Sequence, residues 1–299
     1  MNFRDSSIGF VLMALWGFNF SVIKLGVSEV HPLLLVAMRF FFAVFPMIFF
    51  IRKPAVPSRY LFLYGLSFGT GVWGLVTWSI ELGLSAGVAS LVLETSFIFS
   101  ILVGWLALKE KIAQSTWIGV ALATLGLGIL TFAQDGMVSF AGVILALSGA
   151  FFWAITGLIV KKAKPKTVFS FSVWGMLWIP VPLVVLTLLT SGIEPITALP
   201  QQMNTNAWFS VLFQAYPTTL FGYWVWNYLV VKYPLSIVSP LVLLVPVFSL
   251  LGSHIFHAEI IDSVKILACL LISVGVVAPQ ITLMLQSLRQ NVTSPFRKS

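Results

Sequence analysis

Long stretches without a charged residue restrict the fold of this chain more than any other feature of its sequence. Four of them, each more than twenty residues long, cover Tyr60–Ile80, Ile112–Gln134, Gly136–Val160 and Ile266–Leu288. A helix crosses the hydrocarbon core of a bilayer in about 20 apolar residues, whereas membrane-spanning β-strands are shorter and alternate in polarity. Each stretch therefore predicts a transmembrane helix.

The composition agrees with a chain surrounded by lipid. Of the 299 residues, 59% are hydrophobic and 9% are charged, whereas a soluble domain carries about 25% charged residues. The net charge of +8 would suggest nucleic-acid binding in a soluble protein. No recognition motif is present and the basic residues lie between apolar stretches, so we expect no nucleic-acid partner. The single cysteine, Cys269, excludes an internal disulfide.

The predicted fold class is an all-α membrane protein of about ten transmembrane helices. We expect the spans at about residues 6–27, 31–51, 59–82, 85–108, 113–133, 138–160, 168–190, 207–231, 235–257 and 264–286. The first span resembles a signal peptide, but no small-residue cleavage site follows Lys24, so we expect it to be retained.

The basic residues predict the orientation of these spans. With the N-terminus in the cytoplasm, fourteen of the 17 lysine and arginine residues fall in cytoplasmic segments, and Lys265 alone falls outside. Lys24 and Arg39 lie within spans. The positive-inside rule then predicts cytoplasmic N- and C-termini in a multi-pass protein of the cell inner membrane.

The two halves of the chain show faint similarity to each other. Trp16–Lys24 matches Trp153–Lys161 in its first and last residues, and Glu110 and Gly126 match Glu259 and Gly275 further along. Five spans in each half place the second half in the opposite orientation, and inverted repeats bind substrate near the midplane between them. We therefore divide the chain into a first repeat at 6–133, a second repeat at 138–286 and a basic cytoplasmic tail at 287–299.

An ordered series of short motifs accompanies these spans. They are Trp16-Gly17-x-Asn19-Phe20 with Lys24, Arg39-Phe40, Ser85-Ala86-Gly87-Val88-Ala89-Ser90-Leu91, Lys109-Glu110-Lys111-Ile112, Ser239-Pro240-Leu241, Val245-Pro246 and Ala258-Glu259-Ile260. In this series the chain resembles the EamA-type transporters of the drug/metabolite transporter superfamily, nearest to the branch that exports cysteine-pathway and amino-acid metabolites. The resemblance covers about residues 7–283 and implies a ten-helix inverted repeat and metabolite export.

Four charged residues lie within or at the edges of the spans, where a charge costs at least ~2.5 kcal/mol at the helix centre. Arg39 and Glu94 fall at matched depths, about 12–14 Å below the outer surface, so we predict that they interact. They form either a structural ion pair or a site for a substrate carboxylate or amine. Lys24 and Glu81 fall near the outer face and are candidates for a gate or ion pair, with simple snorkelling to the interface as the alternative.

Aromatic residues stand beside polar ones on single helical faces. The pairs are Trp16 with Asn19, Trp73 with Thr77, Trp153 with Thr156 and Tyr223 with Asn227. Such pairs suit the lining of a substrate cavity, although polar contacts between helices are the other interpretation. Pro240 and Pro246 flank the middle of one span, where we expect a hinge.

These features predict a secondary transporter that exports small amino-acid-like metabolites by alternating access. Uptake or exchange of a metabolite and efflux of hydrophobic drugs are the alternatives. The expected partners are a small-molecule substrate and the lipid bilayer, and the sequence leaves open a homodimer.

An enzyme is the remaining alternative from another class. Gly65, Ser67 and Gly69 fit the G-x-S-x-G pattern of a serine hydrolase. That motif needs a strand–turn–helix context, and here it lies inside an apolar stretch far from every histidine. We predict no enzyme, no cofactor and no metal site, and an intramembrane hydrolase using Ser67 is only a remote reading.

Overall fold

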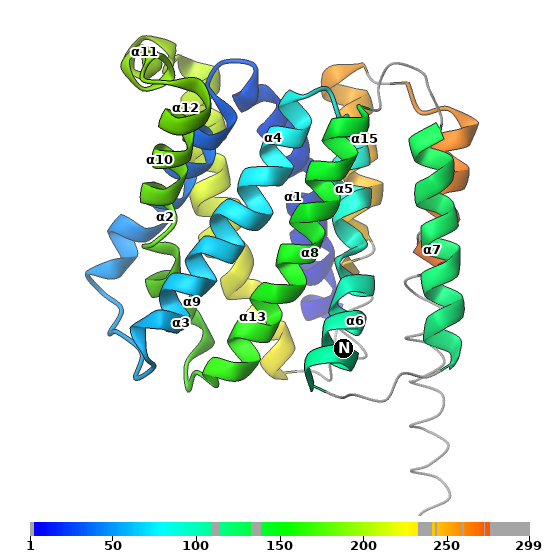
Figure 1. The fold of residues 1–299 in the computed structure, drawn as a ribbon, viewed down its shortest axis with the longest axis horizontal. Coiled ribbons are helices and arrows are strands. Elements are labelled where there is room, and N and C mark those ends of the chain that lie inside the picture. Colours follow the sequence, from blue (N-terminus) through cyan, green and yellow to red (C-terminus); the bar gives the residue numbers. More distant parts are fainter. Residues whose placement is uncertain are drawn as a thin grey trace, which may run out of the picture.

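The computed structural model describes residues 3–108, 114–132, 139–232, 241–242, 244–258, 260–271 and 273–275. Within these ranges the chain forms helices and no strand (Figure 1). Four helical rods are long and apolar enough to cross a membrane: Phe3–Val27, Ser58–Glu81, Phe140–Ala163 and Val168–Ser191. The all-helical class predicted from hydropathy is confirmed.

The helices of the first half lie close to the predicted spans. In chain order they are α1 (Phe3–Val27), α2 (Pro32–Ile48), α3 (Ser58–Gly65), η1 (Leu66–Gly74), α4 (Leu75–Glu81), α5 (Ala86–Glu94), α6 (Ser96–Leu108) and α7 (Gln114–Phe132). The segments α3, η1 and α4 follow one another without a break and form one rod. Ser85 begins α5 because its side chain accepts a hydrogen bond from the backbone N–H of Val88 at 3.3 Å.

The second half adds elements that hydropathy did not predict. It contains α8 (Phe140–Ala163), α9 (Val168–Met176), α10 (Pro180–Ser191), α11 (Glu194–Gln202), α12 (Thr205–Phe213), η2 (Gln214–Phe221), α13 (Gly222–Lys232), α15 (Leu244–His257) and helical residues 263–271 and 273–275. The break between α9 and α10 precedes Pro180, which is favourable at the start of a helix because it lacks an N–H. The surface helix α11 lies where only a connection was expected.

The first helices of the two halves, α1 and α8, run in opposite directions. The end of α1 and the end of α4 line one pocket through Val27 and Glu81, and we call this the pocket end of the bundle. The first turn of α8 lies at the same end, since a Cβ atom at Gly142 would lie 3.0 Å from the backbone oxygen of Ser79. The N-terminus is at the opposite end (Figure 1). This is the direction that inverted halves require.

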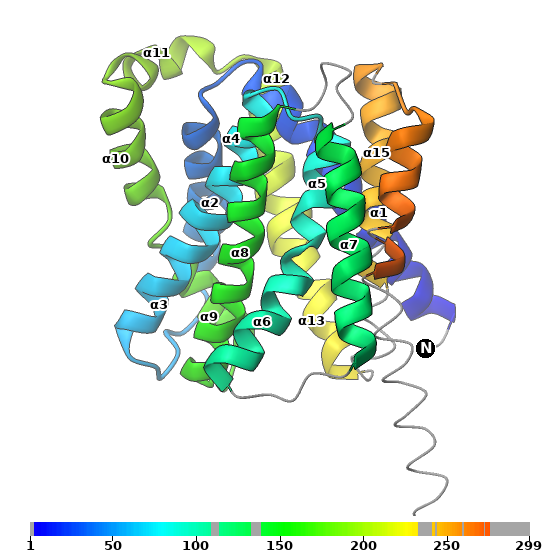
Figure 2. The ribbon, with the colours of Figure 1, turned by 45° about the vertical axis from the view of Figure 1, so that its right-hand side comes forward.

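Packing between the halves follows a reciprocal pattern. The helix α1 packs against α15, and correspondingly α8 packs against α5 and α6. The helices α2 and α10 pack together, as do α5 and α15, and Figure 2 shows α10 and α15 on opposite flanks. The contact of α1 with α15 requires Gly17, because a Cβ atom there would overlap Phe248 and lie 2.7 Å from the backbone oxygen of Val245.

Two π-helical segments interrupt the helices of the bundle. The segment η1 begins at Leu66 and η2 begins at Gln214, an offset of 148 residues. This offset is close to the spacing that relates Glu110 to Glu259 in the sequence. Each segment packs against the first helix of the opposite half, η1 on α8 and η2 on α1. π-helical turns occur frequently at functional sites. The region between the halves, where both segments pack, is therefore the place to look for a site.

Candidate functional site

Arg39, in the middle of α2, is the buried charge around which the candidate site is built. Its side chain is 0% exposed. The Nε atom donates a hydrogen bond to Thr219 Oγ1 at 3.0 Å, and Nη1 donates to Gln214 Oε1 at 3.4 Å. Both acceptors belong to η2, so Arg39 connects the first half of the chain to the second.

The other contact of the Arg39 guanidinium is aromatic. Its Cζ atom lies 4.2 Å from the ring centroid of Trp73, on η1, within the range of a cation–π interaction. Among the described residues, no carboxylate forms an ion pair with Arg39. The buried cation is therefore held by neutral hydroxyl and amide groups and by an aromatic face.

The predicted interaction of Arg39 with Glu94 is wrong. Glu94 is the last residue of α5, which packs against α15, α8 and α1, whereas α2 packs against α10, η2 and α12. No ion pair joins the two side chains in the part of the chain that the structure describes. Matched depth gave the level of each residue in the membrane but not the side of its helix that it occupies.

Phe68, on η1, gathers four of the aromatic residues predicted to line the site. Its ring centroid lies 5.9 Å from Tyr223, 5.9 Å from Trp153 and 6.4 Å from Trp73. Trp16 joins through Tyr223 at 5.8 Å. We call these five residues the Phe68 cluster, and its members come from both halves of the chain.

Polar groups beside the Phe68 cluster have unused hydrogen-bonding capacity. Asn19, which is 1% exposed, accepts a hydrogen bond from Thr218 Oγ1 at 3.1 Å through its Oδ1 atom. Its Nδ2 atom and Thr77 Oγ1 are buried and have no hydrogen-bond partner among the described residues, whereas the Trp73 side chain lies within reach of the Tyr223 hydroxyl. Trp16 Nε1 donates to the backbone oxygen of Thr218 at 3.1 Å. Trp16 and Asn19 therefore meet at Thr218 of η2, whereas Thr77 is unsatisfied in α4.

The remaining predicted site residues fall elsewhere. Thr156, the partner of Trp153, bonds its hydroxyl to the backbone oxygen of Phe152 at 2.8 Å. The side chain of Asn227 lies outside the described residues, as does Pro240. Pro246 lies in the first turn of α15, where proline is tolerated without loss of a helical hydrogen bond. The hinge stays a prediction.

Ser67, the residue of the hydrolase alternative, is engaged in helix packing. Its hydroxyl donates to the backbone oxygen of Phe152 at 3.0 Å and lies 2.9 Å from Thr156 Oγ1. The ring of His31 contacts Ser191 and that of His257 contacts the backbone of Ser21. Since these contacts involve neither a general base nor an oxyanion hole at Ser67, the geometry gives no support to catalysis.

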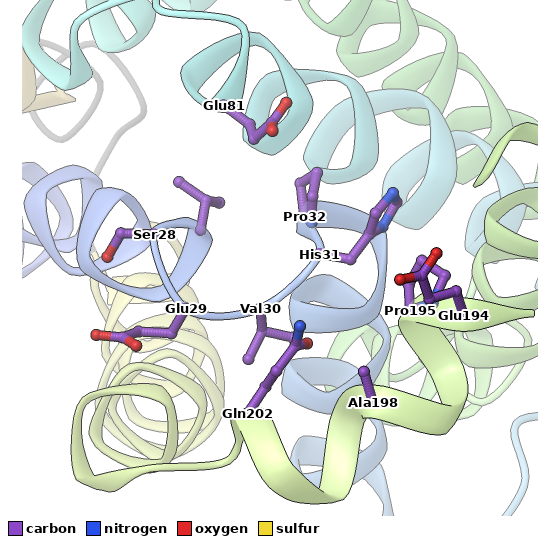
Figure 3. A pocket seen from close by; sticks show the side chains of 11 residues that line it. Ser28, Glu29, Val30, His31, Pro32, Glu81, Glu194, Pro195, Ala198 and Gln202 are labelled. Carbon is purple, nitrogen blue, oxygen red and sulfur yellow. The ribbon is translucent and has the colours of Figure 1, made fainter.

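A hollow of about 290 Å³ opens at the pocket end. Figure 3 shows Glu81, from the end of α4, across the hollow from Gln202 of α11, with His31 and Glu194 at one side. Partial burial lowers the pKa of His31, and the negative charge of Glu81 partly offsets this effect. Lys24 and Glu81 both lie at this end of the bundle. The ion pairs between described residues do not include the predicted one between these two side chains.

An ion pair connects the halves at the opposite end of the bundle. Lys232, the last residue of α13, lies 2.6 Å from the Oδ2 atom of Asp5, whose side chain is almost completely buried in α1. Lys232 Nζ also donates to the hydroxyl of Tyr228 at 2.6 Å. The bundle is thus fastened at the N-terminal end and hollowed at the pocket end.

Sequence reasoning missed the residues of η2 that hold the site together. Gln214, Thr218 and Thr219 were not predicted, although all three are polar residues inside an apolar stretch. A polar residue inside a membrane span costs free energy unless it has a hydrogen-bond partner. The polarity of these three residues is therefore the signal that could have identified them. Phe68 carried no signal, because one phenylalanine among 26 is not distinguishable by its type.

A buried cation inside a bundle of membrane-spanning helices marks a candidate path for a substrate or an ion. The family model described as the EamA-like transporter family matches this chain twice, at residues 6–132 and 140–278. The chain belongs to that family and is a multi-pass inner-membrane transporter of small molecules.

The relatives agree with this assignment. A protein of Salmonella typhimurium named probable amino-acid metabolite efflux pump is 32% identical over 281 residues, which cover 92% of this chain and 94% of that protein. A protein of Escherichia coli with the same name is 31% identical, with the same shares covered. One solved crystal structure is similar in fold, with a TM-score of 0.53 at 17% identity, over 94% of this chain and 96% of that chain.

Proposed function

We propose that this protein exports small amino-acid-like metabolites by alternating access. In this proposal ten transmembrane helices form two inverted repeats, with both termini in the cytoplasm. Membership of the EamA-like family supports a carrier, and the names of the two bacterial relatives support an amino-acid metabolite as substrate. The observation that carries the proposal is the complete burial of Arg39 without an acidic partner among the described residues.

A buried cation needs a counter-charge, because an unpaired charge in the membrane interior costs at least ~2.5 kcal/mol. Among the other acidic side chains that the structure describes, Asp5 pairs with Lys232, Glu29 bonds to Asn204 and Asn206, Asp262 lies 4.0 Å from Lys265, and Glu81 and Glu194 line the pocket. Glu94, the last residue of α5, forms no ion pair with Arg39. A substrate carboxylate bound beside Arg39 would supply the missing negative charge.

The way the halves meet supports alternating access. Arg39 connects α2 to η2, and the Asp5–Lys232 ion pair connects α1 to α13, so both contacts bridge the halves. Under the proposed topology the ion pair closes the cytoplasmic end while the hollow opens outward. Opening the cytoplasmic end requires that the Asp5–Lys232 ion pair separate. At the outer end, Lys24 and Glu81 are the residues that we propose act as a gate when that end closes.

Efflux of hydrophobic drugs is the second candidate, and the Phe68 cluster favours it. Five aromatic side chains offer an apolar surface that accepts many organic molecules. A drug without a charge would gain nothing from Arg39, however, and its binding would leave the guanidinium unpaired. Metabolite uptake or exchange uses the same site and differs only in direction. Assembly as a homodimer stays a prediction.

The test is transport by the purified full-length protein reconstituted in liposomes. Labelled zwitterionic amino acids and labelled lipophilic cations are compared, each with and without a pH gradient. We expect saturable flux of at least one amino acid. Saturable flux of lipophilic cations alone would overturn the metabolite proposal, and a lack of any flux from correctly folded protein would overturn the carrier itself.

A further inference from the structure

We infer that the site recognises its substrate through a carboxylate, and that the amine of an amino acid is dispensable for binding. This rests on the proposed function and goes beyond it, because a zwitterion offers the site two charges and only one of them finds a partner. The substrate class becomes small carboxylates with an apolar side chain, whether or not they carry an amine.

The first support is an excess of hydrogen-bond donors at the site. A guanidinium carries five N–H donors, and described side chains accept two hydrogen bonds from Arg39. Asn19 Nδ2 is a further buried donor without an acceptor among the described residues. A carboxylate has two oxygens and only accepts hydrogen bonds, so it matches these donors in kind.

The second support is that the side-chain acceptors around Arg39 are already engaged, while the hydroxyl of Thr77 is an unpartnered acceptor further along the chain. Asn19 Oδ1 is occupied by Thr218, and Gln214 Oε1 and Thr219 Oγ1 are occupied by Arg39. The face of Trp73, which would attract a cation, already lies against the guanidinium. Glu94 forms no ion pair with Arg39 in the described structure.

The third support is that the amide of Asn19 is buried with a donor that no described residue accepts. The Thr218 hydroxyl lies 3.1 Å from Asn19 Oδ1 and 3.1 Å from the backbone oxygen of Phe213, so its one proton serves two acceptors. Asn19 is 1% exposed, and a buried donor that stays unpaired is unfavourable. A ligand oxygen resolves this, whereas an ammonium group would meet another donor.

The experiment is competition in liposomes containing the full-length protein. The labelled amino acid with the greatest flux is competed with its own 2-hydroxy acid, its decarboxylated amine and its methyl ester. We expect the hydroxy acid to compete within about threefold of the amino acid, and the amine and ester to be at least about tenfold weaker, because hydrogen bonds to a charged group are the strong ones. Competition by the amine but not by the hydroxy acid would overturn the inference and leave amino-acid export standing.

A pair of matched variants tests the donors directly. Asn19→Asp keeps the shape of the side chain and replaces the Nδ2 donor by a negative oxygen, so we expect the carboxylates to compete at least about tenfold less well. Thr187→Val serves as the control, because this buried threonine bonds only to the backbone of Leu183, within its own helix α10. Unchanged competition in a folded Asn19→Asp protein would contradict recognition through this donor.

Discussion

At the residue scale, the unusual feature of the protein is a buried arginine whose partners are all neutral. A buried ion pair loses about 3–5 kcal/mol when one partner is removed, because the other charge is left uncompensated. Arg39 leaves no such orphan when it is replaced, since Thr219 and Gln214 are uncharged. Replacing Arg39 should therefore affect substrate binding much more than it affects the stability of the fold.

The first prediction concerns the stability of Arg39→Gln. We expect the variant to lose substrate binding while its unfolding free energy changes by only about 1–2 kcal/mol, the scale of two lost hydrogen bonds. Thermal unfolding of the detergent-purified protein without substrate measures this. A loss comparable to that of a broken buried ion pair would mean that Arg39 has a structural role.

The second prediction concerns coupling between residues. Arg39 and Glu94 do not pair. We therefore expect the effects of Arg39→Gln and Glu94→Gln on transport, each converted from the rate ratio into a free-energy change, to add within about 0.5 kcal/mol. Arg39→Gln and Thr219→Val share a hydrogen bond, so their effects should not add. Double-mutant cycles in liposomes compare the two pairs, and strong coupling of position 39 to position 94 but not to 219 would contradict the site.

At the element scale, the sequence predicts where helices form but not how they meet. Hydropathy gave α1 and the rod formed by α3, η1 and α4 to within a few residues of their observed ends, because the thickness of the bilayer determines the length of a span. It did not give η1, η2 or the break before Pro180 as specific elements. The π-helical turns form where side chains from another helix fit, so they depend on tertiary packing that no local pattern contains.

The third prediction tests the packing of α1 against α15. Gly17→Ala places a methyl group against Phe248 and the backbone of Val245, so we expect a loss of about 1–3 kcal/mol from overpacking. Gly157→Ala is the matched control in α8, because nothing lies within 4 Å of a Cβ atom there. Thermal unfolding compares the two variants, and equal stability would show that α1 and α15 are packed less closely than described.

At the scale of the whole molecule, the candidate site exists only because the two halves meet. Trp16, Asn19, Arg39 and Trp73 were predicted from the first half, and their partners Thr218, Thr219 and Tyr223 lie about 200 residues away in the chain. Polar residues in apolar stretches identify such candidates because each needs a partner. The identity of the partner depends on helix rotation and was therefore predicted wrongly for Arg39 and Glu94.

The fourth prediction concerns the orientation of the whole bundle. In a Cys269→Ala background, a single cysteine replacing Glu194 should react with an impermeant thiol reagent in intact cells, because α11 lies at the pocket end, which we place outside. A cysteine replacing Lys53, before α3, should react only after the membrane is permeabilised. Labelling at position 53 but not at 194 would reverse the topology.

The central claim is that the guanidinium of Arg39 binds the carboxylate of the substrate, and amino-acid counterflow tests it most directly. Liposomes loaded with unlabelled amino acid are mixed with the labelled form, and the wild-type protein is compared with Arg39→Gln, Arg39→Lys and Arg59→Gln. Arg59 is the matched control, because it is exposed and lies against the ring of Tyr60. We predict that Arg39→Gln lowers flux at least about a hundredfold and Arg39→Lys less severely, since lysine keeps the charge but loses the planar fork. We predict wild-type flux for Arg59→Gln, and wild-type flux for a folded Arg39→Gln protein would contradict the claim.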